Sequence, residues 1–253
     1  IVNDRDDYYP QSNKILYFIS TVDNYNIHTN PHLDIDTNLY LLISVLENCR
    51  KEYGNEFEFN FISSWFVYGK VKIPAQEDCA CFPAGFYSIT KRCAEQLLIS
   101  YCQTYGISYR ILRMSNVIGI NDHKVSKKKN ALQYMIQQLI HGEEVSLYEG
   151  AILRDLIDVR DAADAIYTVM IHGNQNEIYN IGNGVGYSFE KIIYDVQDYL
   201  ETGSIKRISI PEFHKLVQAK DFYLDVSKLH ELGFQSQYEI EESVFEIVEH
   251  YKK

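Results

Sequence analysis

The chain has 253 residues and a formal net charge of −11, and 46% of its residues are hydrophobic. This length supports a large buried core, either in one domain or in a domain with a smaller lobe. The negative charge argues against nucleic acid or an anionic membrane surface as a partner. No apolar run has the length of a membrane-spanning helix.

Strand-like and helix-like segments alternate along the chain, which is the pattern of an α/β protein with a parallel sheet. The expected strands are residues 14–20, 57–63, 108–114, 156–159 and 177–181. The expected helices are residues 38–49, 87–105, 132–141, 161–172, 188–200 and 239–251. Asp161 and Ser188 are the expected N-caps of two of these helices. No linker separates two units, so two lobes would have to be interleaved.

The five cysteines are odd in number and lack the spacing of a disulfide framework. We therefore expect free thiols and a reducing, cytoplasmic compartment. Cys79 and Cys81 are closer together than paired zinc ligands usually are, and no histidine lies near them in the sequence. The sequence therefore predicts no metal site.

The most informative segment is a serine pair, Ser63 and Ser64, at the end of an expected buried strand. Tyr87 and Lys91 follow at the start of a long expected helix, where residues four apart are neighbours. The lysine charge would favour the phenolate and lower the pKa of Tyr87, so that the phenol could act as acid or base near neutral pH. Ser64 would share the proton and orient a substrate oxygen.

A tyrosine four residues before a lysine is weak evidence alone, because the chain holds 21 tyrosines and such pairs arise by chance. A second pair, Tyr68 and Lys72, lies in an expected turn, where the two side chains need not share a face. The alternative for Tyr87 and Lys91 is a surface tyrosine beside a solvated lysine. The serine pair upstream favours the chemical interpretation.

These segments resemble the extended short-chain dehydrogenase/reductase family of NAD-dependent nucleotide-sugar epimerases and dehydratases. Residues 63–69 (SSWFVYG) are similar to that family's strand-end motif, and Tyr87 and Lys91 to its Tyr-x-x-x-Lys motif. The resemblance covers nearly the whole chain, because further matching segments follow in the family's order at residues 37–38, 112–119, 154–161, 179–182 and 225–233.

The resemblance implies a Rossmann-like, doubly wound parallel sheet with a smaller interleaved C-terminal α/β substrate lobe. Residues 1–115 would form a partial NAD(P)-binding domain that carries the catalytic residues. Residues 116–253 would form mainly the nucleotide-sugar-binding lobe, from which residues 155–182 return to the Rossmann core.

The resemblance also implies roles for individual residues. The catalytic residues would be Ser64, Tyr87 and Lys91. The cofactor would be NAD, with NADP not excluded, and its expected contacts are Ser20, Thr21, Asn38, Ser63, Tyr87 and Lys91. Asn116 and Arg154 would meet the diphosphate of a nucleotide sugar, since arginine offers a planar fork of donors. The alternatives are an asparagine in a turn and a surface ion pair between Arg154 and Asp155.

The chain departs from the family pattern in its N-terminal part. No glycine precedes Gly54, so the Gly-rich turn that holds the dinucleotide pyrophosphate is absent. We therefore expect a fragment that lacks the first βαβ unit. Ser20 and Thr21 stand where the family often has two alanines against the nicotinamide, which keeps the side chains small.

The substrate side departs as well. Trp65 and Phe66 occupy the positions of an Asp-Glu pair that the family's dehydratases use as acid and base. Neither side chain can transfer a proton, which argues against dehydration and predicts a narrow sugar pocket, unless both simply pack in the core. Lys220 is the only cation near the family's usual arginine before the last strand.

The leading hypothesis is an NAD(P)-dependent nucleotide-sugar epimerase in which Tyr87 is the acid and base. A reductase of nucleotide 4-keto-sugars that consumes NAD(P)H is the alternative, and the sequence does not separate the two. A non-catalytic nucleotide-binding or regulatory member of the same fold belongs to another class. A dehydrogenase of small alcohols fits less well because Asn116 and Arg154 indicate a diphosphate. By analogy we expect a homodimer formed by the helices at 38–49 and 87–105.

Overall fold

The computed structural model describes residues 9–122, 125–126, 128–150, 152–217 and 221–253. Within this part of the chain, the central sheet has four parallel strands in the order β1 (Lys14–Tyr17), β2 (Glu58–Ser64), β3 (Ser108–Met114) and β7 (Glu177–Ile181). One row of side chains crosses all four strands, with Tyr17 opposite Phe61, Phe61 opposite Ile111 and Ile111 opposite Ile178. The predicted α/β fold with a parallel sheet is confirmed.

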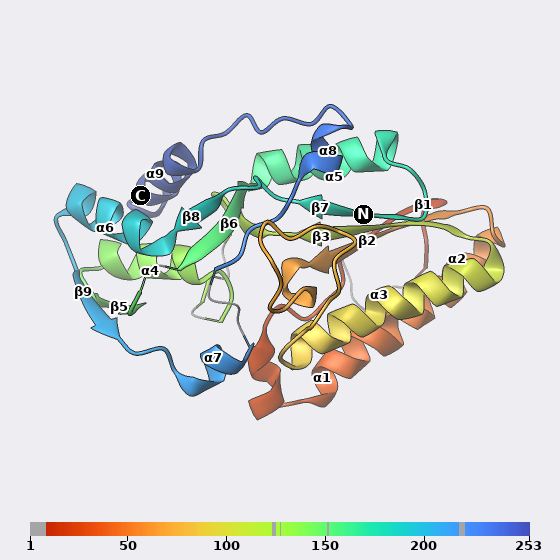
Figure 1. The fold of residues 1–253 in the computed structure, drawn as a ribbon, viewed down its shortest axis with the longest axis horizontal. Helices are drawn as coiled ribbons and strands as arrows, with labels where there is room; N and C mark the ends of the chain where they lie inside the picture. Colours follow the sequence, from red (N-terminus) through yellow and green to blue (C-terminus); the bar gives the residue numbers. More distant parts are fainter. Residues whose placement is uncertain (1–8, 123–124, 127, 151, 218–220) are drawn as a thin grey trace.

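Helices cover both faces of this sheet (Figure 1). The long helices α2 (Leu41–Tyr53) and α3 (Phe86–Tyr105) lie on one face, and α5 (Val159–His172) and α8 (Ser227–His230) lie on the other. Because both faces are covered, β3 is buried at every position except Ser108. Its apolar residues are typical of a strand inside a parallel sheet, and its two buried arginines, Arg110 and Arg113, are paired with Glu58 and Glu95.

A short irregular segment leads into α2 and positions residues at the carboxyl end of β1. Helix α1 (His32–Ile35) continues into one π-helical turn, η2 (Asp36–Tyr40), before regular α-helix begins. Asn38 lies in this π turn and is buried, with 2% of its surface exposed. Single π turns inside helices are often found at functional sites.

The C-terminal lobe is built around two further sheets of the described chain. One joins β4 (Asn116–Ile118), β6 (Leu153–Asp158) and β8 (Gly186–Ser188), and the other pairs β5 (Glu144–Tyr148) with β9 (Ser204–Ile208). The helices α4 (Ala131–Ile140), α6 (Phe189–Leu200) and α9 (Ile240–Tyr251) share one apolar core with them. Ser188 caps α6 as predicted, by accepting from the N–H of Lys191.

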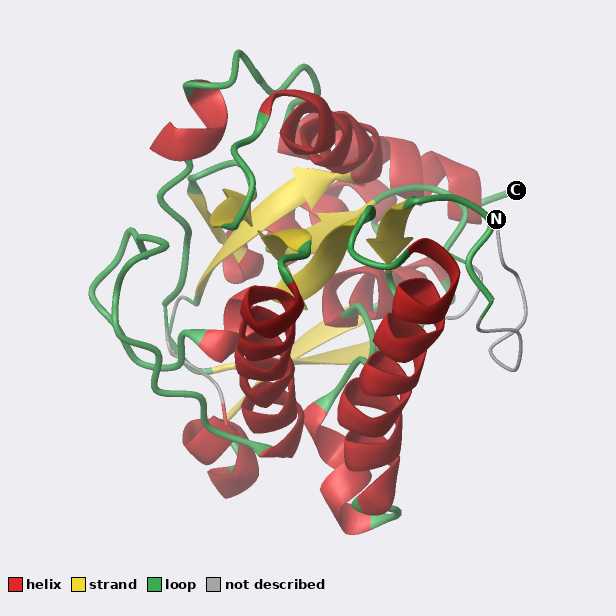
Figure 2. Cartoon of the chain, turned by 90° about the vertical axis from the view of Figure 1, so that its right-hand side faces the viewer, coloured by secondary structure: helices red, strands yellow, loops and turns green. Residues whose placement is uncertain are grey.

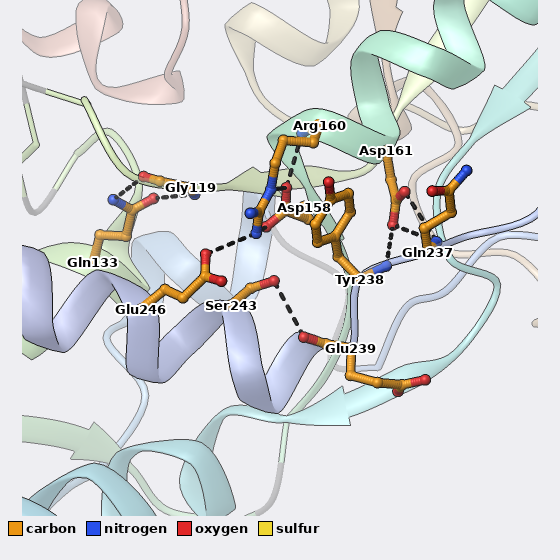
Figure 3. A network of polar contacts seen from close by, with 10 residues as sticks. All are labelled: Gly119, Gln133, Asp158, Arg160, Asp161, Gln237, Tyr238, Glu239, Ser243 and Glu246. Carbon is orange, nitrogen blue, oxygen red and sulfur yellow. Dashed lines mark hydrogen bonds and ion pairs between the residues drawn. The ribbon is translucent and has the colours of Figure 1, made fainter.

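A polar network ties α9 and the segment before it to the start of α5 (Figure 3). Asp158 caps α5 by accepting from the backbone N–H of Arg160, and its carboxylate also receives the Arg160 guanidinium at 2.8 and 2.9 Å. Arg160 extends to Glu246 of α9 at 2.8 Å. The predicted cap, Asp161, instead accepts from the backbone N–H groups of Gln237 and Tyr238. The prediction was wrong because β6 runs directly into α5, so its last residue also serves as the cap.

The expected elements are otherwise close to the observed ones. β3 and β7 have the predicted bounds, whereas β6 begins three residues before the expected start at 156. The short strands β4, β5, β8 and β9 were not anticipated. In the described chain, none of the helices is both long and apolar enough to span a bilayer.

Candidate active site

The site is built at the carboxyl end of β2, where the chain leaves the sheet in a tight turn. Ser64 ends the strand and caps the short 3₁₀ helix η3 (Trp65–Val67) by accepting from the N–H of Phe66 at 3.3 Å. Gly69 follows with φ +65°, and a Cβ at this residue would lie 1.8 Å from the carbonyl oxygen of Phe82. The closing glycine of the motif therefore allows two backbone segments to approach closely.

Tyr87 lies in the first turn of α3, after Gly85 with φ +100°, and is only 7% exposed. The nearby hydroxyls of Ser64 and Ser20 act to lower the pKa of its phenol. Burial raises the pKa of Tyr87 to about 12, and the carboxylates of Asp34 and Asp23 add to this rise. The sequence predicted a pKa below the ordinary value, and that prediction was wrong for this structure because desolvation dominates.

Lys91 lies one helical turn after Tyr87 and is 2% exposed. Its ammonium donates to the carbonyl oxygen of Ile62 at 2.7 Å and lies 4.2 Å from the centre of the Phe61 ring. Burial lowers the pKa of Lys91 to about 7, and the nearby carboxylate of Glu95 opposes this effect. Lys91 is therefore anchored to β2 and can change its charge near neutral pH.

Ser63 has different partners from Ser64. Its hydroxyl donates to Glu95 at 2.6 Å, and Glu95 pairs with Arg113 through contacts of 3.0 and 2.9 Å. Arg113 is 1% exposed and Glu95 is fully buried. The Ser63 side chain therefore belongs to a buried ion-pair network, and its contact with a cofactor stays a prediction.

Ser20, Thr21 and Asn38 form a cluster that joins the end of β1 to α3. The amide oxygen of Asn38 accepts from the backbone N–H of Thr21 and from the hydroxyl of Ser20, each at 3.0 Å. Its amide nitrogen donates to Thr21 Oγ1 at 2.8 Å and to Thr90 Oγ1 at 3.0 Å. These contacts occupy both the oxygen and the nitrogen of the Asn38 amide. Asn38 therefore holds the surrounding residues in place, whereas Ser20 lies near Tyr87.

A cavity of about 960 Å³ extends from this point into the C-terminal lobe. Trp65 and Phe66 line one part of it with their rings stacked at 4.1 Å. Phe66 also meets the ring of Tyr87 edge-on, with the ring centres 5.9 Å apart. Phe66 therefore connects the cavity wall to the ring of Tyr87, which does not itself line the cavity, and the cavity volume is in the range of small-molecule sites.

The predicted diphosphate residues also line this cavity. Arg154 is 7% exposed, donates to the carbonyl oxygen of Leu153 at 2.8 Å and lies 5.4 Å from the Trp65 ring. Burial lowers its pKa to about 10, which leaves the guanidinium charged at neutral pH. Asn116 donates to the carbonyl oxygen of Asp155 at 2.9 Å. Lys220 lies outside the described residues.

Three cavity residues were missed by the sequence analysis. His214, in α7 (Glu212–Val217), lies between Tyr25 of η1 (Asn24–His28) and Tyr148 of β5. Tyr148 is 2.8 Å from Nδ1 of His214, and the hydroxyl of Tyr25 contacts Nε2. The two tyrosines come from opposite sides of the cavity. They belong to no recognisable motif and are brought together only by the fold.

The described residues suit one end of a nicotinamide dinucleotide. A buried phenol and a buried ammonium lie at the carboxyl edge of a parallel sheet, where α/β proteins bind such ligands, and both offer donors to ribose hydroxyls. Among the first 53 residues there is no glycine that could form a pyrophosphate-binding turn. A search of the described residues finds no group of three His, Cys, Asp or Glu side chains suited to a metal ion.

Several known proteins have similar sequences. The putative UDP-glucose 4-epimerase of Methanocaldococcus jannaschii is 28% identical over 221 residues, which cover 87% of this chain and 70% of that protein. The dTDP-glucose 4,6-dehydratase of Haemophilus influenzae is 27% identical over 238 residues, covering 86% and 69%. The crystal structure of the UDP-glucose 4-epimerase of Thermotoga maritima has the same fold, with a TM-score of 0.83 at 24% identity over 95% of this chain and 77% of that one.

The sequence model of the NAD dependent epimerase/dehydratase family matches residues 15–182, which include most of β1, all of β2, and Tyr87, Lys91 and Arg154. The match covers well over half of the 253 residues. Proteins of this family are enzymes that act on nucleotide sugars with NAD as cofactor. The chain therefore belongs to the NAD dependent epimerase/dehydratase family.

Proposed function

We propose that the chain acts as an NAD(P)-dependent epimerase that moves a proton and a hydride at a hydroxyl-bearing carbon of a nucleotide sugar. The observation that carries this proposal is the buried Tyr87, whose ring meets edge-on the ring of Phe66, a residue of the cavity wall. When bound, the nicotinamide supplies the hydride acceptor and donor. The residues of the chain bind the sugar and move the proton.

Each residue has a role that follows from its position. Tyr87 exchanges the proton with the sugar oxygen, and Ser64 holds that oxygen in place through its hydroxyl. Lys91 provides a cation behind the phenol that is fixed to the carbonyl of Ile62. Arg154 and Asn116, further along the cavity, are placed to bind the diphosphate of the substrate.

Dehydration is not proposed, although several relatives are dTDP-glucose 4,6-dehydratases. Elimination needs an acid and a base beside the reacting carbons. The two residues after Ser64 are Trp65 and Phe66, which stack on each other, and neither ring can exchange a proton. Trp65 also packs against Phe222 with its ring tilted. The apolar wall therefore supports chemistry at a single sugar oxygen.

Reduction of a nucleotide 4-keto-sugar is the second candidate, and the raised pKa of Tyr87 favours it. A phenol that keeps its proton at neutral pH is suited to protonating a keto oxygen as hydride arrives at the carbon. An epimerase needs the same group to accept a proton first. Consumption of reduced cofactor in proportion to product would identify the reductase.

The domain division at residues 1–115 and 116–253, with 155–182 returning to the first unit, also stays a proposal. It is supported by β7, which joins the central sheet, while β6 pairs with β4 and β8. We further propose a homodimer through α2 and α3, the two long helices that lie side by side in Figure 2. It is supported by the exposed apolar residues Ile89 and Leu97 of α3. The five free cysteines support a reducing, cytoplasmic location.

Replacement of the phenol tests the function. With UDP-glucose or UDP-galactose and added NAD, we expect Tyr87→Phe to lower kcat by at least about 100-fold, because the proton-transfer group is lost. The free energy of unfolding should change by less than about 1 kcal/mol. Tyr199→Phe is the matched control, since its hydroxyl contacts Glu249 on the surface, and it should keep full activity.

Retained turnover in Tyr87→Phe would contradict the assignment of this residue. If the unaltered chain binds nucleotide sugar but shows no turnover with oxidised or reduced cofactor, the non-catalytic alternative is favoured. Both measurements use the whole chain.

A further inference from the structure

The short helix α7 (Glu212–Val217) passes between the two lobes of the chain. Figure 1 shows it at the lower edge of the molecule, between the strands β5 and β9 on one side and the helices α1 and α3 on the other. Its residue His214 lines the cavity. The helix therefore forms part of the cavity wall at the junction of the two lobes.

The apolar packing of α7 is weak. Val217 is the only one of its six residues that is buried, and the side chain of Leu216 is 70% exposed. None of the six residues belongs to the three apolar clusters that form the core of the described chain. Segments with few buried apolar contacts open at a lower free energy than the core does. Apolar packing alone therefore does not hold α7 against the cavity.

His214 joins α7 to both lobes through its two ring nitrogens. Nδ1 lies 2.8 Å from the hydroxyl of Tyr148 in β5, and Nε2 contacts the hydroxyl of Tyr25 in η1. A neutral imidazole has one donor nitrogen and one acceptor nitrogen, and a tyrosine hydroxyl can serve either of them. The two tyrosines therefore satisfy both nitrogens of the ring at the same time.

Ring contacts support the same position of α7. The ring centre of His214 lies 5.7 Å from that of Tyr25 and 5.3 Å from that of Tyr148. The ring centre of Phe213 lies 5.4 Å from that of Tyr25 and 4.8 Å from that of His28. These contacts place α7 against η1, and the bond to Tyr148 extends its attachment to β5.

The two tyrosines belong to elements that are themselves well anchored. Asp23 caps η1 by accepting from the backbone N–H of Tyr25 at 2.6 Å. Asn24, which is 4% exposed, accepts from the backbone N–H of Ser88 in α3 at 3.4 Å. Tyr148 lies in β5, which pairs with β9 along its whole length. A weakly packed helix is therefore attached between two fixed points.

From this geometry we propose that α7 is a strap over the cavity and that His214 is the latch that holds it closed. The strap opens when His214 leaves Tyr25 and Tyr148, so that a nucleotide sugar can enter or leave, and it closes when the two hydrogen bonds form again. His214 is a positioning residue, because its nitrogens are bound by the tyrosines. The identity of the ligand rests on the proposed function.

A strap of this kind suits the proposed reaction. An epimerase must keep its keto sugar bound until hydride returns to the carbon, and a reductase must exclude water while hydride is transferred. Closures over a site serve both purposes, and their opening often sets the rate of product release.

A latch and a direct ligand contact have different kinetic effects. Loss of the latch makes opening more frequent with and without ligand, so association and dissociation should accelerate by a similar factor while Kd changes little. Loss of a ligand contact acts mainly on the dissociation rate, and Kd then weakens in proportion. The two binding rates therefore distinguish the two roles of His214.

The chain carries its own reporter for these rates, because its single tryptophan, Trp65, lines the cavity. Trp65 fluorescence after stopped-flow mixing with UDP-glucose gives both rate constants, and calorimetry gives Kd. His214→Phe keeps an aromatic ring and removes both nitrogens. We expect both rates to rise by about 10-fold, the factor for a net loss of one or two hydrogen bonds, with Kd within about 3-fold.

Two further variants identify the latch itself. Tyr148→Phe should raise both rates in the unaltered chain and have no further effect in His214→Phe, because the two side chains share one hydrogen bond. His172→Phe is the matched control, since His172 is exposed in the last turn of α5 and does not line the cavity, and it should leave both rates unchanged. If His214→Phe does not fold, His214→Ala replaces it.

Hydrogen exchange at the backbone amides of α7 measures the opening without any ligand. In His214→Phe these amides should exchange about 10-fold faster than in the unaltered chain, whereas those of α9 should not change. Faster exchange in a protein that does not bind UDP-glucose would support the latch and contradict the proposed function, so that the two failures are distinguishable. Unchanged exchange in α7, unchanged binding rates, or faster dissociation alone would each overturn the proposal.

Discussion

Ser63 and Ser64 are neighbours at the end of β2, yet they belong to two different polar regions. Ser63 donates to Glu95, which is held by the buried guanidinium of Arg113 at 2.9 and 3.0 Å. Ser64 contacts the phenol of Tyr87, a group that can gain or lose a proton. The two adjacent serines therefore have different partners. Ser63 is bound to a residue of fixed charge, and Ser64 to a residue that can titrate.

The difference shows how the chain separates support from chemistry. Around Ser63, opposite charges are paired and each hydrogen bond has a permanent partner, which favours a single rigid arrangement. Around Ser64, the hydroxyl proton remains available and the phenol can ionise. We infer that the first region holds the strand end in place while the second region performs the proton transfer.

The largest expected effect comes from removing the ion pair in the region around Ser63. Glu95→Ala leaves Arg113 as a buried charge without its partner, and we expect a loss of about 3 to 5 kcal/mol in the free energy of unfolding. Chemical denaturation measures this loss. Glu47→Ala is the matched control, because its pair with Arg50 is about one-third exposed on both sides, and it should cost less than about 1 kcal/mol. Equal losses in the two variants would contradict the structural role of Glu95.

The ion pair in this region also predicts that the free energy of unfolding depends on pH. Arg113 and its hydrogen bonds hold the pKa of Glu95 below its ordinary value, although burial opposes them. The carboxylate therefore contributes stability above the pKa of the unfolded chain, and this contribution is lost as the pH falls through the lower pKa of the folded state. In Glu95→Ala this acid-dependent loss should be absent.

The serines themselves give the second, smaller effect. Ser63→Ala should lower the free energy of unfolding by about 1.5 to 3 kcal/mol, since it removes a hydrogen bond to a buried charge, and should leave kcat unchanged. Ser64→Ala should lower kcat by roughly 10 to 100-fold, an effect of about 1.4 to 2.8 kcal/mol on the barrier, with little change in stability. Parallel denaturation and rate measurements on the two variants check this. If Ser63→Ala lowered kcat and Ser64→Ala lowered stability instead, the roles of the two regions would be reversed.

Much of this arrangement could be predicted from the sequence, because its signals are local. The strand end at Ser64 and the helical neighbours Tyr87 and Lys91 lie within 28 residues of each other, and Gly69 marks the turn between them. Such segments carry their own turn and helix patterns. The fold class, the sheet and the position of the candidate acid therefore follow from the sequence.

The partners of these residues could not be predicted in the same way. Ser20 is held by the amide of Asn38, 18 positions further along the chain, and His214 meets Tyr25 across 189 positions. The sign of the pKa shift of Tyr87 was also wrong, because burial by α1 and the loops outweighs the effect of any single neighbour. Contacts over such sequence separations depend on tertiary packing and leave no local pattern.

The smallest expected effect concerns Lys91, which lies between the two regions and is in contact with Ile62 of β2. Its pKa is about 7 in the folded chain because burial disfavours the ammonium, and the ordinary value is 10.5. Between these values the unfolded chain binds a proton that the folded chain has released, so stability rises with pH from about 7 upward. Below pH 7 both states are protonated and no such change is expected.

Comparison with Lys91→Met isolates this contribution, because methionine has a similar shape and no charge. From pH 7 to pH 8, the unaltered chain should gain up to about 1.4 kcal/mol relative to the variant, which is the limit for one proton. Denaturation curves at several pH values measure the difference. Lys191→Met, which removes an exposed lysine paired with Asp195, should show no such trend in this range.

A difference between Lys91→Met and the unaltered chain that does not vary with pH would mean that Lys91 keeps its charge in the folded state. Lys91 would then belong with Arg113 among the fixed charges and not with Tyr87 among the groups that titrate.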